Sequence, residues 1–339
     1  MAKLMSSAHA SNREDVKDSI LETIGQTPMV RLARIAPADG PDVMVKIESF
    51  NPGGSIKDRV GLAMIEDAEA RGLLRPGSTI IEATAGNTGM GLALAASVKG
   101  YKAVFVVPDK MSSEKIDLLR AYGAEVVITT TSVPPNHPDY YVNRARSIAA
   151  SIKGAFVPDQ FSNPANPEAH HATTGLEIWL QAGGRLDYFV AGMGTGGTIS
   201  GAGRALKEKD PHIKIIGVDP EGSVYAGYKR TGEIGPAGPY MVEGIGEEFI
   251  PKTMAMDVVD EIITVSDRDS FLTARELARA EGILAGGSGG AALFAALQIS
   301  KRLGKKGRLK RIVALLPDTG RNYLSKIYSD SWMKANGFI

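Results

Sequence analysis

Asn51-Pro52-Gly53-Gly54-Ser55-Ile56-Lys57-Asp58-Arg59 joins a strand-like run at residues 43–48 to apolar residues at helical spacing over residues 56–70. The proline and the two glycines predict a tight turn between the strand and the helix. Ser55 is expected to cap the helix. Asp58, three residues later, would complete a capping box with aspartate in place of the usual glutamate or glutamine.

Lys57 falls in the first turn of this predicted helix. Lysine is uncommon there, because the positive end of the helix dipole disfavours an ammonium group. The same dipole lowers the pKa of the amine and makes it a better nucleophile for a carbonyl, which suggests a Schiff base. A surface lysine that happens to follow a turn is the alternative, and this segment alone favours neither.

Composition excludes several classes of protein. The 339 residues suffice for one large or two medium domains, and the formal net charge of +1 implies no broad attraction to nucleic acid or to an anionic membrane. The chain has no cysteine, which excludes disulfides, thiolate metal sites and thiol catalysis. It contains neither a signal-peptide pattern nor an apolar run of about 18 residues, so we expect a cytoplasmic protein without membrane partners.

Strands and helices alternate in two series, separated by a proline-rich break at residues 133–138. Strands are predicted at residues 43–48, 79–82, 102–108, 124–130, 186–191, 213–219, 261–265 and 311–316. Helices are predicted at residues 15–24, 56–70, 112–122, 139–153, 196–209, 266–281 and 291–303, with another ending at 99. This alternation predicts an α/β fold of two lobes with a cleft between them. Residues 221–240, rich in Gly and Pro, are expected to form a long surface loop.

Four glycine-bearing loops lie at strand ends or helix starts, where open α/β sheets bind ligands, and the first carries Lys57. The second, Thr84-Ala85-Gly86-Asn87-Thr88, opens a helix, so its backbone amides can receive an anion such as a substrate carboxylate. Asn87 adds a side-chain donor for a phenolate oxygen. A capped helix start without a ligand is the alternative, and it is favoured when this loop is taken alone.

The third loop, Gly192-Met193-Gly194-Thr195-Gly196-Gly197-Thr198, directly follows a strand. Clustered glycines let backbone amides approach a phosphate, and the threonines add hydroxyl donors, so phosphate binding is favoured over a purely structural turn. The loop also matches G-x-G-x-x-G, and Asp219 ends the next strand, close to where a dinucleotide-binding fold keeps its ribose-binding acid. An NAD-dependent oxidoreductase therefore stays open.

The fourth loop is Gly286-Gly287-Ser288-Gly289-Gly290, in which Ser288 can face a ring nitrogen. Alone, it favours a glycine turn that needs positive φ. The five histidines show no recurring metal-ligand spacing, so we predict structural roles for them and no metal site.

Together these loops resemble the β-family of pyridoxal-phosphate (PLP) enzymes, fold type II, over residues 20–338. Residues 51–59 are similar to its Schiff-base lysine motif, residues 84–88 to its substrate-carboxylate loop and residues 194–198 to its phosphate loop. Residues 160–167 and Gly287-Ser288 match as well. Within the family the chain is similar to the cysteine synthase and cystathionine β-synthase branch. Four further segments resemble the cystathionine β-synthases more closely, namely residues 242–246, 249–251, 316–323 and 329–333.

The resemblance implies a role for each matching residue. Lys57 would hold the cofactor and move the α-proton, and Asn87 and Ser288 would face the cofactor's 3′-oxygen and pyridine nitrogen. The phosphate would lie on Gly194, Thr195, Gly196, Gly197 and Thr198. The substrates would contact Thr84, Ala85, Gly86, Thr88, Gln160 and Glu243.

The resemblance also implies an architecture. Each lobe would be a mostly parallel sheet flanked by helices, with the active site in the cleft. The smaller lobe would span residues 47–158, and the larger lobe residues 20–46 plus 159–339, after an N-terminal tail and short helix at residues 1–19. A homodimer is expected, with neither a haem-binding extension nor the regulatory tandem module of the animal enzymes.

The implied activity is replacement of the β-substituent of serine or O-acetylserine by a thiol. Homocysteine, giving cystathionine, is the leading acceptor, and sulfide, giving cysteine, is the second. Cysteine synthases usually carry Gln where Glu243 stands, Ala85 replaces a common serine, and animal cystathionine synthases have Tyr at Glu247. A neutral hydroxyl at Ser288 favours β-elimination and β-replacement over transamination. An NAD-dependent oxidoreductase and a catalytically silent binding protein are the alternatives of other classes.

Overall fold

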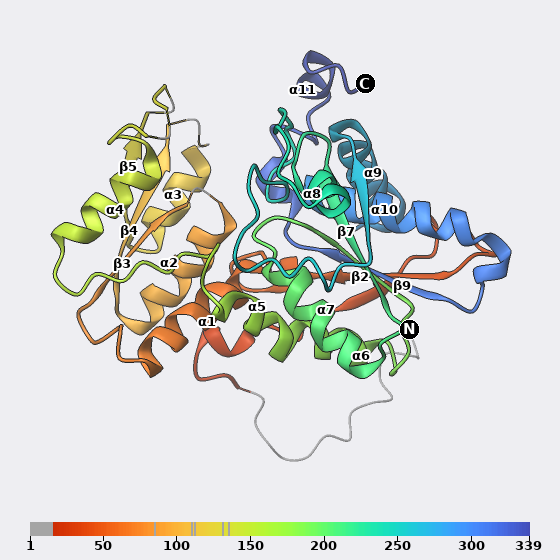
Figure 1. The fold of residues 1–339 in the computed structure, drawn as a ribbon, viewed down its shortest axis with the longest axis horizontal. Helices are drawn as coiled ribbons and strands as arrows, with labels where there is room; N and C mark the ends of the chain where they lie inside the picture. Colours follow the sequence, from red (N-terminus) through yellow and green to blue (C-terminus); the bar gives the residue numbers. More distant parts are fainter. Residues whose placement is uncertain (1–15, 85, 110, 112, 131, 135) are drawn as a thin grey trace.

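The computed structural model describes residues 16–339 apart from residues 85, 110, 112, 131 and 135 (Figure 1). Its strands are β1 (Met29–Arg31), β2 (Asp42–Ile47), β3 (Thr79–Ala83), β4 (Lys102–Pro108), β5 (Glu125–Thr129), β6 (Tyr188–Gly192), β7 (Lys214–Pro220), β8 (Glu261–Val265) and β9 (Arg311–Leu316). One sheet has the order β1-β2-β9-β6-β7-β8, and a second has the order β3-β4-β5. Among the strands of the described residues, only β1 pairs antiparallel. The predicted α/β fold with two mostly parallel sheets is confirmed.

The two sheets lie in separate bodies, which we call the larger lobe (six strands) and the smaller lobe (three strands) (Figure 1). Both sheets are buried on both faces, as continuous apolar strands predict. In β2, Val43 and Val45 pack into the core on one face, and Met44 packs into the core on the other. In β4, Phe105 and Val106 likewise face opposite cores.

Helices cover these sheets (Figure 1). They are α1 (Lys57–Ala70), α2 (Asn87–Lys99), α3 (Ser113–Ala121), α4 (Tyr141–Ser151), α5 (Ala165–Ala169), α6 (Gly175–Gln181), α7 (Gly197–Lys209), α8 (Tyr225–Thr231), α9 (Asp267–Glu281), α10 (Gly287–Leu303) and α11 (Asp330–Ala335). A π-helical turn, His170–Thr174, joins α5 to α6. Among the described residues, no helix is long and apolar enough to span a membrane.

A close approach of two helices positions Lys57. A Cβ added at Gly61 of α1 would overlap the backbone of Gly91 in α2, and one at Gly91 would overlap the carbonyl of Lys57. Only glycine at both positions permits this contact without a shift of the backbone. The first turn of α1 is therefore held directly against α2.

The helix starts differ from some predictions. The capping box at Ser55 and Asp58 is absent: α1 begins at Lys57, and the Asp58 carboxylate accepts a hydrogen bond from the Gly53 amide at 2.6 Å. The turn folds back on the helix, and this gives the carboxylate a partner within the turn instead. Helix α9, by contrast, has a side-chain cap: Ser266 accepts from the Asp269 amide.

Three other segments also differ from prediction. The helix expected at residues 15–24 is a 3₁₀ turn, Ile20–Thr23, and Asp15 lies outside the described residues. Helix α10 begins at Gly287, four residues before the predicted start at Ala291. The supposed surface loop at residues 221–240 contains α8, which fully buries Tyr225.

Candidate active site

Lys57 lies at the junction of the lobes, beside the glycine loop that follows β6. A cavity of about 30 Å³ is lined by Lys57 together with Gly194, Thr195, Gly196 and Thr198. Burial lowers the pKa of the Lys57 amine, although Asp318 and Glu247 oppose this shift. Within the described part of the chain, no carboxylate lies at ion-pair distance from this amine. Burial therefore favours the neutral form of this amine.

The loop itself is built to receive an anion. Gly196 has φ of +85°, and a Cβ on Gly194 would lie 2.7 Å from the Gly244 carbonyl oxygen. No backbone carbonyl of the described residues accepts from the amides of Gly194, Thr195 or Gly196. These amides precede α7, whose N-terminus adds a favourable dipole for negative charge. A phosphate group fits this donor set.

Residues distant in sequence hold the loop in shape. Asn166 donates from Nδ2 to Thr195 Oγ1 at 3.1 Å, and Thr253 donates to the Thr195 carbonyl at 2.6 Å. His170 Nε2 lies 3.2 Å from Thr198 Oγ1, and burial keeps the pKa of His170 well below its usual range. Sequence reasoning did not identify Thr253 as a loop contact, and it treated His170 as structural without linking it to Thr198.

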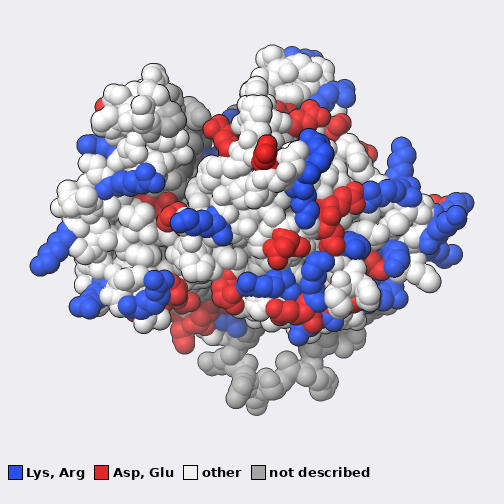
Figure 2. Space-filling model, viewed as in Figure 1, with Lys and Arg blue, Asp and Glu red and all other residues white. Residues whose placement is uncertain are grey.

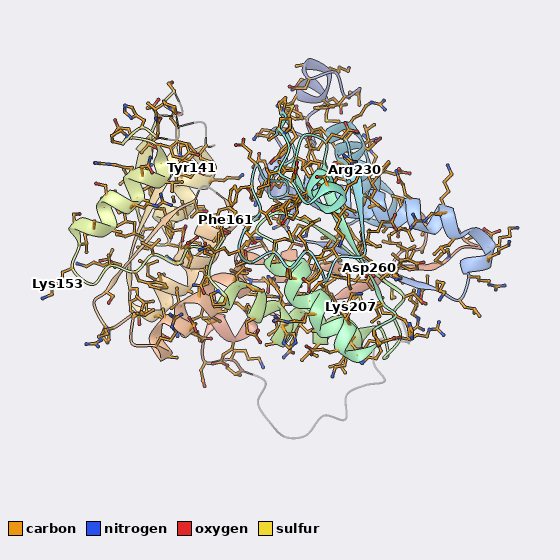
Figure 3. All side chains as sticks on the ribbon, viewed as in Figure 1. Tyr141, Lys153, Phe161, Lys207, Arg230 and Asp260 are labelled. Atoms are coloured by element: carbon orange, nitrogen blue, oxygen red, sulfur yellow. The ribbon has the colours of Figure 1, made fainter. Side chains whose placement is uncertain are left out.

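The second loop opens α2, with Gly86 as the N-cap residue and Asn87 as the first helical residue. The side chains of Thr88 and Gln160 are brought together: the Thr88 hydroxyl donates to Gln160 Oε1 at 2.5 Å. Thr84 is buried beside this start. Ala85 lies outside the described residues. Phe161, which follows Gln160, lies where the two lobes meet, whereas Tyr141 belongs to the smaller lobe (Figure 3).

A buried carboxylate that sequence reasoning did not single out contacts Asn87. Asp318, after β9, accepts from Asn87 Nδ2 at 2.9 Å and from the Tyr323 hydroxyl at 2.7 Å, both at Oδ2. Its Oδ1 has no partner among the described residues, and burial raises the pKa of Asp318. In the sequence, residues 316–323 stand out only by their resemblance to the family. No local motif marks Asp318 as a contact of Asn87.

Ser288 is the second residue of α10 and is buried. Its hydroxyl makes no hydrogen bond to another residue that the structure describes. Two residues earlier, a Cβ on Gly286 would overlap the Asp318 carboxylate, so this loop packs closely against the segment after β9. The Ser288 hydroxyl is therefore available to a ligand.

A second cavity, of about 530 Å³, opens between the lobes and is lined by Gly86 and Asn87 from the smaller lobe and by Glu243 from the larger. Glu243 accepts from Lys115 Nζ and from Lys326 Nζ, each at 2.6 Å. Burial opposes ionisation, but the two ammonium groups lower the pKa of Glu243 overall. Glu243 thus lines the cleft as a carboxylate. Figure 2 shows a hollow between the lobes and charges of both signs mixed over the face in view.

Two other residues of the lysine motif, Asn51 and Arg59, belong to a buried network of ion pairs and hydrogen bonds. Arg59 donates to Glu48 at 2.8 Å and to Glu177 at 2.6 Å, and Asn51 donates to the same Glu48 carboxylate at 2.8 Å. Lys46 donates to Glu177 at 2.7 Å. Since each buried charge has a partner, this network can hold the turn before α1 without leaving an uncompensated charge.

Asp219, the residue that kept the dinucleotide-binding alternative open, does not face a cavity. Asp219 is fully buried and accepts from the Ala226 amide at 2.9 Å, so it holds the start of α8. Burial also raises the pKa of Asp219. A fully buried carboxylate is not available to a ribose hydroxyl. The G-x-G-x-x-G match is therefore left without the ribose-binding acid that a dinucleotide site requires.

The chain is similar to known proteins over most of its length. Residues 20–318 match the family described as pyridoxal-phosphate dependent enzyme. Cystathionine β-synthase of Apis mellifera is 48% identical over 96% of this chain and 64% of that protein. The Rattus norvegicus enzyme is 49% identical over 94% of this chain and 57% of that protein. The chain therefore spans about three fifths of the length of these curated relatives.

Two solved structures are similar over nearly the whole of both chains. A hydrogen sulfide-producing enzyme from Fusobacterium nucleatum has a TM-score of 0.83 and 41% identity, and the match covers 91% of this chain and 100% of that one. O-ureido-L-serine synthase has a TM-score of 0.85 and 39% identity, covering 94% and 99%.

Proposed function

Because the chain belongs to the family of pyridoxal-phosphate dependent enzymes, we propose that it replaces the β-substituent of serine or O-acetylserine with a thiol. Homocysteine, giving cystathionine, is the proposed acceptor, since cystathionine β-synthases match nearly the whole chain. The observation that carries the proposal is the position of the Lys57 amine. It lies without an ion-pair partner among the described residues, in one cavity with a loop of unpaired backbone amides.

The described residues fit the cofactor. Lys57 would bind its aldehyde carbon, the amides at residues 194–198 its phosphate, Asn87 its 3′-oxygen and Ser288 its pyridine nitrogen. The Ser288 hydroxyl and the amides of Gly194, Thr195 and Gly196, which donate to no described residue, are the donors that such a group requires. When bound, PLP supplies an electron sink for charge that develops at the substrate α-carbon.

Lys57 would move the α-proton. An amine accepts a proton only in its neutral form, and burial favours that form here. The amine lies on the first turn of α1, which the Gly61–Gly91 contact fixes against α2. The packing of α1 against α2, and not a flexible loop, therefore positions the backbone of the residue that would act as the base.

The donor's carboxylate would lie at the start of α2. The amides there point out of the helix end, and Gln160 is oriented by the hydrogen bond from Thr88 to its Oε1. That bond leaves Gln160 Nε2 free to donate, since no described residue accepts from it. Gly86, Thr88 and Gln160 would thus orient the amino acid so that its α-proton faces Lys57.

A cysteine synthase that uses sulfide is the second candidate. It is favoured by the likeness to a hydrogen sulfide-producing enzyme and to O-ureido-L-serine synthase. Glu243 separates the two, because a carboxylate in the cleft can accept from the ammonium of homocysteine, a contact that sulfide cannot make.

A product assay decides between them. The purified protein is given serine or O-acetylserine, each with homocysteine or sulfide, and cystathionine and cysteine are quantified by mass spectrometry. Cystathionine as the main product supports the proposal. Cysteine alone supports the second candidate, and no product with any pair contradicts both.

The assembly proposed is a homodimer in the cytoplasm, with the lobes divided at residues 47–158 against 20–46 plus 159–339. The two sheets of the described fold support this division, and the family likeness supports the dimer. Size-exclusion chromatography with light scattering measures the molar mass in solution. A molar mass equal to that of one chain would contradict the dimer.

A further inference from the structure

A buried carboxyl group anchors the backbone directly before Gln160. Glu82, near the end of β3, is only 6% exposed, and its Oε2 accepts from the Asp159 amide at 2.9 Å. The chain approaches this point alongside β3, since the Ile81 amide donates to the Phe156 carbonyl at 2.9 Å. The Glu82 bond therefore joins the end of a smaller-lobe strand to the segment that carries Gln160.

Asp159 has a backbone conformation that needs such an anchor. Its φ is +50°, a left-handed value, and within the described chain Gln26 is the one other non-glycine residue with positive φ. The Asp159 side chain is exposed, so packing around that side chain does not impose the conformation. The Asp159 carbonyl accepts from the amides of Ser162 and Asn163, and its amide donates to Glu82. Backbone strain held by its surroundings in this way is typical of functional sites.

Gln160, the next residue, is bound on two sides. Its side chain accepts from the Thr88 hydroxyl at 2.5 Å, and its carbonyl accepts from Asn166 Nδ2 at 2.8 Å. The carbonyl of the residue after it accepts from the Thr253 hydroxyl at 3.1 Å. Asn166 and Thr253 also bind Thr195 of the phosphate loop, so the far side of Gln160 is fixed to that loop. A change in the backbone before Gln160 would therefore turn its side chain away from the start of α2.

We propose that Glu82 is a positioning residue: by holding the Asp159 backbone, it directs Gln160 Nε2 toward the carboxylate of the amino-acid donor. The inference rests on the proposed function, in which Gln160 contacts that carboxylate, and it names a residue that acts through Gln160. Burial raises the pKa of Glu82 to about 8, so its carboxyl group is mainly protonated at neutral pH. Glutamine resembles the protonated acid and keeps an oxygen that accepts from an amide, so it should replace Glu82.

Binding of L-alanine and of ethylamine, which lacks the carboxylate, tests the proposal. Neither ligand has a β-leaving group, and the change in visible absorbance of the PLP-loaded protein measures each Kd. Glu82→Met should raise the Kd of L-alanine about tenfold and that of ethylamine less than about twofold, because only the carboxylate would contact Gln160. Glu82→Gln should keep both values. An equal rise for the two ligands, or an unchanged Kd of L-alanine in Glu82→Met, overturns the proposal.

Two substitutions at Asp159 test the same step without altering the core, and they carry the test if Glu82→Met does not fold. Both replace an exposed side chain, remove the same charge and keep the amide that donates to Glu82. Valine strongly disfavours positive φ, whereas glycine adopts it readily. Asp159→Val should therefore raise the Kd of L-alanine about tenfold, and Asp159→Gly should keep it. Equal Kd values for L-alanine in these two variants overturn the proposal.

Hydrogen exchange separates this inference from the proposed function, because it needs no substrate. Exchange of the backbone amides of residues 157–163, followed by mass spectrometry, should be about tenfold faster in Glu82→Met than in the wild type. Glu125→Met, the same substitution at the exposed start of β5, should leave it unchanged. If the wild type binds neither L-alanine nor ethylamine, the proposed function is wrong. Faster exchange in Glu82→Met would then still support the anchor at Asp159, and unchanged exchange would overturn it.

Discussion

Asn87 of the smaller lobe donates a hydrogen bond to Asp318 of the larger lobe at 2.9 Å, between residues 231 positions apart. The bond uses one of the two amide hydrogens of Asn87 and leaves the other for a ligand. Asp318 is buried and also accepts from Tyr323, so it can fix the orientation of the Asn87 amide. The proposed contact with the cofactor's 3′-oxygen depends on this orientation.

Asp318→Asn should weaken PLP binding about tenfold. The substitution replaces a charge-assisted hydrogen bond by a neutral one, a loss of about 1–2 kcal/mol. Titration of the cofactor-free protein with PLP, followed by visible absorbance, measures the affinity. Asp39→Asn, which alters an exposed ion pair with Lys305, is the control and should bind as the wild type does. Equal affinity in both variants would leave Asp318 without a positioning role.

Lys57→Ala should lose β-replacement activity by about 10³-fold or more, because the general base and the covalent attachment are both removed. It should also lack the visible absorbance that borohydride bleaches in the wild type. Lys102→Ala, at the exposed start of β4, should keep both properties. Retained activity in Lys57→Ala would contradict the proposed function.

Ser288→Asp tests the electronic argument for β-chemistry. A carboxylate facing the pyridine nitrogen would keep the ring protonated and make it a stronger electron sink, which favours transamination. We expect slower β-replacement, and Ser288→Ala provides the comparison in which only the hydroxyl is removed. Stopped-flow absorbance and product analysis measure the rates, and thermal unfolding shows whether the buried site tolerates the acid. An unchanged β-replacement rate in folded Ser288→Asp would contradict the proposed effect of Ser288 on the cofactor ring.

Glu243→Gln should raise the KM for homocysteine about tenfold and affect sulfide less. The amide keeps the shape but loses the charge that pairs with an ammonium and with two lysines. Steady-state kinetics with the two acceptors give the comparison. Equal turnover of homocysteine by the variant and the wild type would remove the support that Glu243 lends to cystathionine formation.

Glu82 predicts a pH dependence of stability. Burial raises the pKa of Glu82 to about 8, while the unfolded chain has the ordinary value of 4.5. Between these two values the native state binds more protons than the unfolded state, so the free energy of unfolding falls as pH rises, by at most about 1.4 kcal/mol per pH unit. Glu82→Gln cannot ionise and should flatten this slope in urea unfolding at pH 5.5, 6.5 and 7.5. Glu66→Gln, an exposed position, should leave the slope as it is.

Local patterns in the sequence were sufficient for much of the fold. Apolar runs such as β4 and β9 are buried on both faces, so their hydrophobic residues identify strands without knowledge of their neighbours. The position of Lys57 at the start of a helix also follows from local signals, because a turn and a helix are set by residues close in sequence. The capping box was wrong because Asp58 has a partner in the turn that spacing alone does not reveal.

The sequence by itself predicted most of the strands and helices, the glycine loops and the position of Lys57 at a helix start, since these depend on backbone preferences within a few residues. Only the tertiary structure decided which side chains meet across the lobes. Asp318 reaches Asn87, Glu243 reaches Lys115, and Asp219 is buried against the start of α8. The physical reason is that such contacts arise from the packing of two separately formed sheets, and this packing leaves no periodic pattern in the chain.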